Sequence, residues 1–199
     1  VMEFINKIVA SLVGADEVSA ATDRNKNAEI QNYFFDKATH QRVIVDGRDT
    51  RPGDKQYHWE QRGVPIRIEV GPRDVAAGAA LVKRRLDRGK ETITLDGFSK
   101  DWLQNKLNEL HQAMFDKAMA FQTANTREAK TYDELKQIVA SDGGFVRCYY
   151  EPTPENDAKI KAETKATVRC IPFEQADGEG VDIFTGKPTK TQVLFAQSY

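Results

Sequence analysis

Residues 46–62 gather side chains that can recognise the edge of a nucleic-acid base. The basic members are Arg48, Arg51, Lys55 and Arg62, the aromatic members Tyr57, His58 and Trp59, and the acidic members Asp46, Asp49 and Glu60. Unpaired RNA bases are bound by stacking on aromatic rings and by hydrogen bonds to their edges. A guanine needs donors for O6 and N7, which Arg or Lys supplies, and a carboxylate can accept from its N–H groups. An alternative fits these residues equally well: Trp59 belongs to the core and the charged side chains pair with one another on the surface.

The distribution of charge also fits a phosphate-bearing partner. The net charge of the 199 residues is only −1, but residues 42–90 hold twelve Lys or Arg against seven Asp or Glu. A local basic face can attract nucleic acid. Solvated charge without a partner explains such an excess as well.

Catalytic motifs are absent from the sequence. There is no phosphate-binding GxxxxGK[ST], no GxGxxG, no GxSxG and no HExxH, and the three histidines lie far apart. We therefore do not expect independent catalysis. No apolar run is long enough to span a bilayer, so no membrane association is expected. Cys148 and Cys170 are expected to be reduced thiols, with a disulfide as the alternative.

Hydrophobic periodicity predicts the elements that position these side chains. The first half should contain, in order, a helix over 4–13 ended by Gly14, a loop or loose helix over 16–27, a helical face over 30–35, a strand over 42–45, a short helix capped by Asp54 and running through Arg62, a strand over 66–70, and a hairpin of strands 79–86 and 91–95.

The second half opens on a long helix capped by Ser99. Its apolar stripe is expected to be core or a domain-packing surface and consists of Leu103, Leu107, Leu110, Met114, Ala118 and Phe121. Then follow a helix opened by the capping box Thr131–Glu134, a strand over 145–150, a helix capped by Thr153, a strand over 167–171, a glycine-rich turn region over 177–186 and a strand over 192–196. This order predicts an α/β (α+β) chain with two small domains, 1–97 and 131–199, and a connecting helix within 98–130.

The sequence over residues 46–75, DGRDTRPGDKQYHWEQRGVPIRIEVGPRDV, resembles a family signature. It is similar to the pattern DRD…PG…K…WE…KGVP.R.E.GPRD in the anticodon-binding domain of prolyl-tRNA synthetases of the archaeal/eukaryotic-like type. The likeness continues through KIKAETKATVRCIPFEQ, GKP and the terminal VLFAQSY, and covers residues 43–199 nearly continuously.

This resemblance implies a class II aminoacyl-tRNA synthetase anticodon-binding fold, a mixed sheet flanked by helices, followed by a small α+β domain that resembles a zinc-binding one. The chain starts at Val1 inside a predicted helix, which suggests a fragment whose first strand and catalytic core are missing. The parent enzyme would be a cytoplasmic homodimer that uses ATP and Mg²⁺ to charge tRNA with proline. The expected partners are tRNA for proline and the parent's catalytic domain, and the chain alone should be inactive.

The resemblance also assigns roles to single residues. Arg48 matches the arginine of the DRD motif and Lys55 the lysine of PG-x-K, so both are expected to contact bases or phosphates. Asp46 and Glu60 match acidic positions of the same site. Tyr199 matches the family's C-terminal tyrosine, which would dock toward the catalytic core.

Departures from the family pattern fall in both domains. Gly47 stands where a second aspartate is common, and Gln56 and Gln61 replace apolar residues, so the short helix should pack differently. Many relatives hold zinc in the last domain with four cysteines; the aligned positions here are Glu151, Asn156, Asp182 and Thr185. Zn²⁺ prefers Cys and His ligands. We therefore expect no zinc in this chain, and a C-terminal domain held by its apolar core instead.

Two functions from different classes remain at this point. The first is the tRNA-recognition part of a prolyl-tRNA synthetase that reads the guanines of the proline anticodon. The second is a structural or interaction module of the same fold that binds no tRNA, which the altered helix and the lost zinc ligands would favour. A standalone enzyme has no motif to support it.

Overall fold

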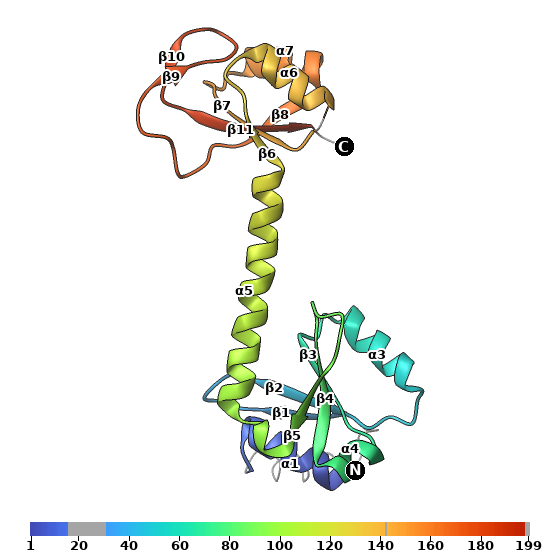
Figure 1. Ribbon diagram of the computed structural model, residues 1–199. Helices are drawn as coiled ribbons and strands as arrows, with labels where there is room; N and C mark the ends of the chain where they lie inside the picture. The colour runs from blue at the N-terminus through green and yellow to red at the C-terminus, as the bar shows by residue number, and fades with distance from the viewer. Residues whose placement is uncertain (16–30, 142, 198–199) are drawn as a thin grey trace. The chain divides into compact units, whose positions relative to one another are not determined.

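The computed structural model describes residues 1–15, 31–141 and 143–197 (Figure 1). They form two compact units, Val1–Phe115 and Asp116–Tyr199, and the division falls inside the long helix α5 (Lys100–Ala124). The polar segment 16–27 lies outside the described residues. The predicted α/β class is confirmed, whereas the predicted domain limits at 97 and 131 stay a prediction. No helix in the described part of the chain is long and apolar enough to cross a membrane.

The described part of the first unit combines two antiparallel sheets with three α-helices, a 3-10 turn and the start of α5. Its elements are α1 (Met2–Val13), β1 (Gln31–Phe35), β2 (Arg42–Asp46), α3 (Pro52–Gln61), β3 (Ile66–Glu69), α4 (Pro72–Ala77), β4 (Ala79–Arg84), β5 (Glu91–Thr94) and the 3-10 turn η1 (Leu95–Gly97). Strand β1 pairs with β2, and β4 lies between β3 and β5. Figure 1 shows α1 beside β1 and β2, and α3 alongside β3.

The core of this unit lies between α1 and the strands. Helix α1 ends at Gly14, as predicted, and its buried side chains are Phe4, Ile8, Val9, Leu12 and Val13. They pack with Ala80 and Val82 of β4 and with Leu103 of α5. Because burying each such side chain removes apolar surface from water, α1 contributes strongly to the stability of the unit.

The helix predicted over 30–35 is wrong, because residues 31–35 form β1. The register places Phe35 opposite Arg42 and Phe34 opposite Val43. A short apolar run has no period that separates helix from strand, and aromatic residues favour strands. The turn is closed locally, since Asp36 N–H donates to the Gln41 carbonyl at 3.0 Å.

Other short elements also differ from prediction. Helix α3 begins at Pro52 with Arg51 as its N-cap, so Asp54 lies in the first turn and is not the cap. Proline suits this position because its missing N–H would have no helical partner. Residues 72–77, for which no element was predicted, form helix α4 (Pro72–Ala77). Its start is fixed by the Gly71 N–H, which donates to Asp74 Oδ2 at 2.7 Å.

An ion pair ties the β1–β2 turn to the start of α5. Buried Asp36 accepts from Lys100 Nζ at 2.6 Å and from the backbone N–H of Ala38 at 2.8 Å. The bond from Lys100, followed by that from Ala38, lowers the pKa of Asp36 to about 2. This carboxyl therefore takes up its proton at lower pH in the folded chain than in the unfolded chain.

This difference predicts a pH dependence of stability. The contribution of Asp36 should be fully present above about pH 4 and be lost as the pH falls toward about 2, because the unfolded state binds the proton first. Urea unfolding at several pH values should show a shallower acid dependence for Asp36→Asn than for wild type. Exposed Asp101→Asn is the control, and equal slopes for Asp36→Asn and wild type would contradict the assignment.

Helix α5 begins at the predicted cap, where the Trp102 N–H donates to Ser99 Oγ at 3.0 Å. The apolar stripe is buried at Leu103 and Leu110. In the second half, Met114 is 42% and Phe121 is 69% exposed. The stripe is therefore core over the first half of α5, and a packing surface in its second half stays a prediction.

The described part of the second unit contains a four-stranded sheet, a separate pair of two-residue strands and two helices. After α5 come β6 (Thr126–Glu128), α6 (Tyr132–Ser141), β7 (Phe145–Tyr149), α7 (Pro154–Thr164), β8 (Ala166–Cys170), β9 (Gly180–Val181), β10 (Pro188–Thr189) and β11 (Gln192–Gln197). The sheet order is β6-β7-β11-β8, with β6 parallel to β7 and the other pairs antiparallel. Helices α6 and α7 lie together on one face of the sheet (Figure 1).

Both predicted caps in this unit are present. The Glu134 N–H donates to Thr131 Oγ1 at 3.2 Å, and the Asn156 N–H donates to Thr153 Oγ1 at 3.3 Å. The strand β6 and the β9–β10 pair were not predicted; β6 falls within the residues assigned to the connecting helix. Cys148 is buried and Cys170 exposed, and both are free thiols, as predicted.

Candidate nucleic-acid interface

Helix α3 carries most of the side chains that sequence singled out, and it has no buried residue. Its sequence, PGDKQYHWEQ, offers no apolar stripe that could pack on β3. The helix must therefore be held by polar contacts, and these contacts fall into two groups.

The first group, which we call the Asp46 cluster, comprises Asp46, Arg48, Lys55 and Trp59. Arg48 Nε and Nη2 donate to the two carboxylate oxygens of Asp46 at 2.9 and 2.7 Å. The Trp59 indole N–H donates to Asp46 Oδ2 at 2.7 Å, and Lys55 Nζ lies 3.5 Å from the Asp46 carbonyl oxygen. The bonds from Arg48 hold the pKa of Asp46 well below its usual range, and the Trp59 bond adds to the effect.

Each oxygen of Asp46 thus accepts from two donors, since Oδ1 also receives the Arg48 backbone N–H at 3.2 Å. A carboxylate has about four acceptor positions, and here all of them are used. Asp46 therefore orients Arg48 and Trp59 and has little capacity left for a ligand.

The second group, which we call the Arg67 network, joins α3 to β3 and the β4–β5 turn. Arg67 Nη1 donates to Glu60 Oε1 and its Nε to Glu69 Oε1, both at 2.9 Å. Lys90 Nζ donates to Glu69 Oε2 at 2.5 Å, and Gln56 Nε2 donates to Glu69 Oε1 at 3.3 Å. The hydrogen bond from Arg67 lowers the pKa of Glu60. Burial favours neutral Glu69, but the bonds from Lys90 and Arg67 outweigh it and lower its pKa.

The aromatic side chains of α3 differ in what they can do. Trp59 is half-buried outside the core clusters and meets the His58 ring edge-on, with centroids 4.9 Å apart. Burial, then the charges of Arg62 and Arg48, lower the pKa of His58, so it is neutral near pH 7. Tyr57 is 64% exposed, and its hydroxyl accepts from Gln61 at 2.8 Å. Of the three rings, Tyr57 is the one open to stacking.

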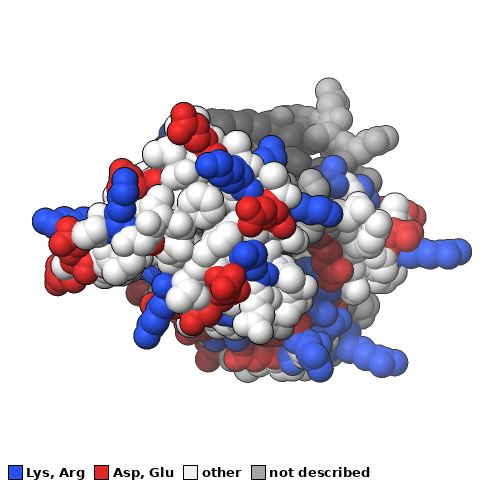
Figure 2. Space-filling view, turned by 90° about the horizontal axis from the view of Figure 1, so that it is seen from above, with Lys and Arg blue, Asp and Glu red and all other residues white. Residues whose placement is uncertain are grey.

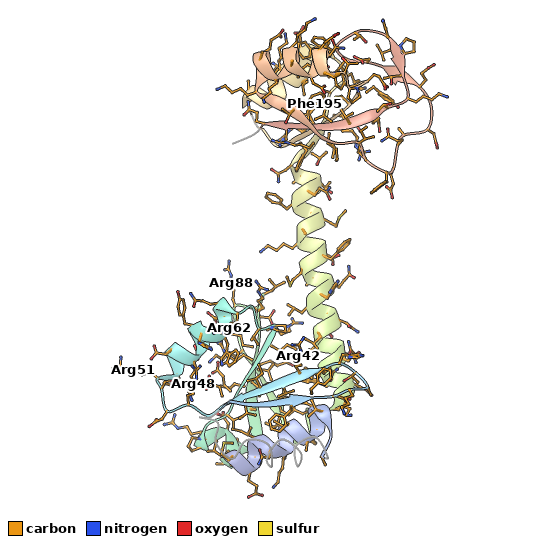
Figure 3. The ribbon with its side chains drawn as sticks, turned by 180° about the vertical axis from the view of Figure 1, so that it is seen from behind. Arg42, Arg48, Arg51, Arg62, Arg88 and Phe195 are labelled. Atoms are coloured by element: carbon orange, nitrogen blue, oxygen red, sulfur yellow. The ribbon has the colours of Figure 1, made fainter. Side chains whose placement is uncertain are left out.

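Arginines extend along α3. Figure 3 shows Arg51 and Arg48 toward the N-terminal end of the helix, Arg62 toward its C-terminal end and Arg88 beyond it at the β4–β5 turn. Arg51 and Arg88 are exposed, and no ion pair joins them to another described residue. Seen from above in Figure 2, Lys and Arg side chains are interspersed with Asp and Glu. The row along α3 is suited to phosphates.

The structure thus brings Asp46, Arg48 and Lys55 together and places Glu60 in the Arg67 network on the same helix. Tyr199 lies outside the described residues. Sequence reasoning missed Arg67, Glu69 and Lys90, although Arg67 and Glu69 fall in the RIE of the matched signature. Their alternation with apolar residues indicated only a strand with one polar face. The altered positions Gln56 and Gln61 are both explained, because each makes a polar contact in place of packing.

Comparisons with known proteins agree with these features. A family model described as "Anticodon binding domain" matches residues 9–106, and one described as "Prolyl-tRNA synthetase, C-terminal" matches residues 132–199. A proline–tRNA ligase from Azobacteroides pseudotrichonymphae is 37% identical over 194 residues, which are 97% of this chain and 38% of that protein. The chain belongs to the prolyl-tRNA synthetase family.

Two further proline–tRNA ligases are similar to most of the chain. The proline–tRNA ligase of Roseiflexus sp. (strain RS-1) is 43% identical over 162 residues, 79% of this chain and 33% of its own length. That of Chloroherpeton thalassium is 39% identical over 78% of this chain and 34% of its own length. The chain spans about one third of the length of the curated relatives it matches. Its first unit is the family's anticodon-binding domain.

Proposed function

We propose that this chain is the tRNA-recognition part of a proline–tRNA ligase and that the α3 surface reads the guanines of the proline anticodon. The proposal rests on the Asp46 cluster, in which Asp46 holds Arg48 and contacts Lys55, two hydrogen-bond donors within the region that matches the anticodon-binding domain. Charging of tRNA with proline, with ATP and Mg²⁺, would belong to a catalytic domain outside this chain. Action on tRNA also supports a cytoplasmic setting, and a homodimer would form through the parent protein.

The proposed roles follow from which groups are already engaged. Among the described residues, Lys55 makes a single hydrogen bond, 3.5 Å long, to the Asp46 carbonyl oxygen, so its ammonium can donate to guanine O6 or N7. Arg48 is held by Asp46 in a bidentate pair, which fixes the direction of its guanidinium. Both residues therefore act as donors from fixed positions, one at the end of β2 and the other on α3.

The acceptor for guanine N–H groups is Glu60 rather than Asp46. Glu60 is 56% exposed in its side chain and uses Oε1 for Arg67. Among the described residues no hydrogen-bond donor reaches Glu60 Oε2, whereas both carboxylate oxygens of Asp46 already accept two hydrogen bonds each. The exposed ring of Tyr57 supplies a stacking surface on the same helix.

Binding of proline tRNA to the purified chain tests this function. We expect binding that weakens steeply with added salt, because Arg51 and its neighbours displace counterions from phosphates. The same tRNA with both anticodon guanines replaced by adenine should bind at least about 10-fold more weakly, the loss expected for one mismatched base contact. Equal affinity for the two tRNAs at every salt concentration would contradict guanine recognition and favour a structural module of the same fold.

A further inference from the structure

The strongest departure of this chain from its family lies in the second unit, at the four positions aligned with zinc-binding cysteines. Glu151 follows β7, Asn156 lies in α7, and Asp182 and Thr185 lie between β9 and β10. Zn²⁺ in structural sites is held by Cys or His. Among the described residues no group of three or more His, Cys, Asp or Glu is placed to hold a metal ion. The side chains at these four positions therefore do not fit the zinc ion that the family resemblance implies.

What these positions form instead is a set of hydrogen bonds around Asp182, which is only 2% exposed. Its Oδ1 accepts the backbone N–H groups of Phe184 and Thr185, both at 2.8 Å. Its Oδ2 accepts the backbone N–H of Glu151 at 2.9 Å. One carboxylate therefore joins the turn after β9 to the end of β7, two segments 31 residues apart in the chain.

The backbone of Asp182 and the side chain of Glu151 extend these connections. The Asp182 N–H donates to the Lys187 carbonyl at 2.8 Å, which closes the turn before β10. Glu151 Oε2 accepts from the hydroxyls of Thr189 and Thr191, each at 2.9 Å. Glu151 thus links the end of β7 to β10 and to the residue that precedes β11.

We propose that this Asp182 cluster, made of Asp182, Glu151 and the donors they accept, is a metal-free replacement for the zinc site. A zinc bound at these four positions would join the end of β7, the start of α7 and the β9–β10 turn. The Asp182 cluster joins the first and third of these, and the Thr153 cap fixes the start of α7. Glu151 and Asp182, two of the four aligned positions, thus accept hydrogen bonds from backbone N–H and hydroxyl groups where the resemblance implies metal-binding cysteines.

The cluster adds to the apolar core that was expected to hold this unit. Ile183 and Phe184, which lie within the turn that Asp182 opens, pack against the buried residues of the second unit. The Phe184 ring meets Tyr132 of α6 edge-on, with centroids 5.0 Å apart. The bonds to Asp182 fix the turn from which these side chains enter the core. Loss of the carboxylate would therefore release both the turn and part of the packing.

Thermal unfolding of the whole chain tests the proposal. Asp182→Ala removes the acceptor of three part-buried backbone N–H groups, so the melting temperature of the second unit should fall by about 10 °C. Asp182→Asn keeps an oxygen that can accept from the turn, but it places an NH₂ group against the Glu151 N–H. We expect its melting temperature to fall by about half as much. Exposed Asp177→Ala, in the same loop region, is the matched control and should leave the melting temperature within about 2 °C.

Two further readouts keep the test decisive. Backbone amides 151, 184 and 185 should exchange slowly with deuterium in wild type and faster in Asp182→Asn, even if Asp182→Ala does not fold. Added Zn²⁺ or EDTA should leave the wild-type melting temperature unchanged. Stoichiometric zinc in the purified chain, a fall of several degrees with EDTA, or Asp182 variants as stable as Asp177→Ala would each overturn the proposal.

Discussion

Replacing Asp46 with alanine should weaken binding of proline tRNA by about 10- to 100-fold, although Asp46 itself has no acceptor capacity left for a base. The change removes the shared acceptor of Arg48 and Trp59, so the guanidinium and the indole both lose the bonds that orient them. Fluorescence anisotropy with labelled tRNA at one fixed salt concentration measures the effect.

The matched control for this prediction is Asp49→Ala, an exposed acid three residues away. It should bind tRNA as well as wild type does, or slightly better, because it removes a negative charge near the RNA. Circular dichroism of both variants separates lost binding from lost folding. If Asp46→Ala and Asp49→Ala bind alike, the orienting role of the Asp46 cluster is wrong.

Replacing Arg67 with methionine should destabilise the first unit by about 2 kcal/mol and weaken tRNA binding as well. The Arg67 side chain is 15% exposed and joins Glu60 of α3 to Glu69 of β3. Removing one member of a largely buried ion pair leaves an uncompensated charge, here partly compensated because Glu69 keeps Lys90. Since α3 buries no side chain, it depends on this network for its position.

A double-mutant cycle separates the network from general damage. In the Glu60→Gln background, Arg67→Met should cost less stability and less tRNA affinity than it does in wild type, because one of its partners is already changed. Arg73→Met, an exposed arginine of α4, is the control and should change stability by less than about 0.5 kcal/mol. Purely additive effects of Glu60→Gln and Arg67→Met would contradict the coupling.

The parts of the fold that sequence predicted are those with a clear local signal. Helix α1 has a full apolar face and a terminal glycine, and the β4–β5 hairpin has two strands around a polar turn. Strand β1 was wrongly predicted to be a helix, because over so few residues Phe34 and its aromatic neighbours fit a helix face as well as a strand. Its strand state depends on pairing with β2, which is a tertiary contact.

The sequence predicted which residues belong to the candidate site, but not which hydrogen bonds join them. The signature indicated that Arg48, Lys55 and Glu60 belong together, yet not which carboxylate is engaged by which base. Asp46 and Glu60 look alike in sequence, but in the part of the chain that the structure describes both oxygens of Asp46 accept two hydrogen bonds each, whereas Glu60 Oε2 accepts none. The burial of Asp182 could not be predicted either, because in sequence it is one acid in a glycine-rich turn. Its partners are backbone N–H groups, one of them 31 residues away and the others within the turn.

The most direct test is the ratio of affinities for proline tRNA and its guanine-to-adenine variant, measured in wild type and in the Arg48→Ala/Lys55→Ala chain. A pair of specific base contacts predicts a wild-type ratio of about 10 to 100 and a ratio near 1 in the variant, with the remaining affinity still sensitive to salt. A variant that keeps the wild-type ratio while binding both tRNAs more weakly would show that these residues contact only phosphates. That result would contradict guanine recognition by the Asp46 cluster.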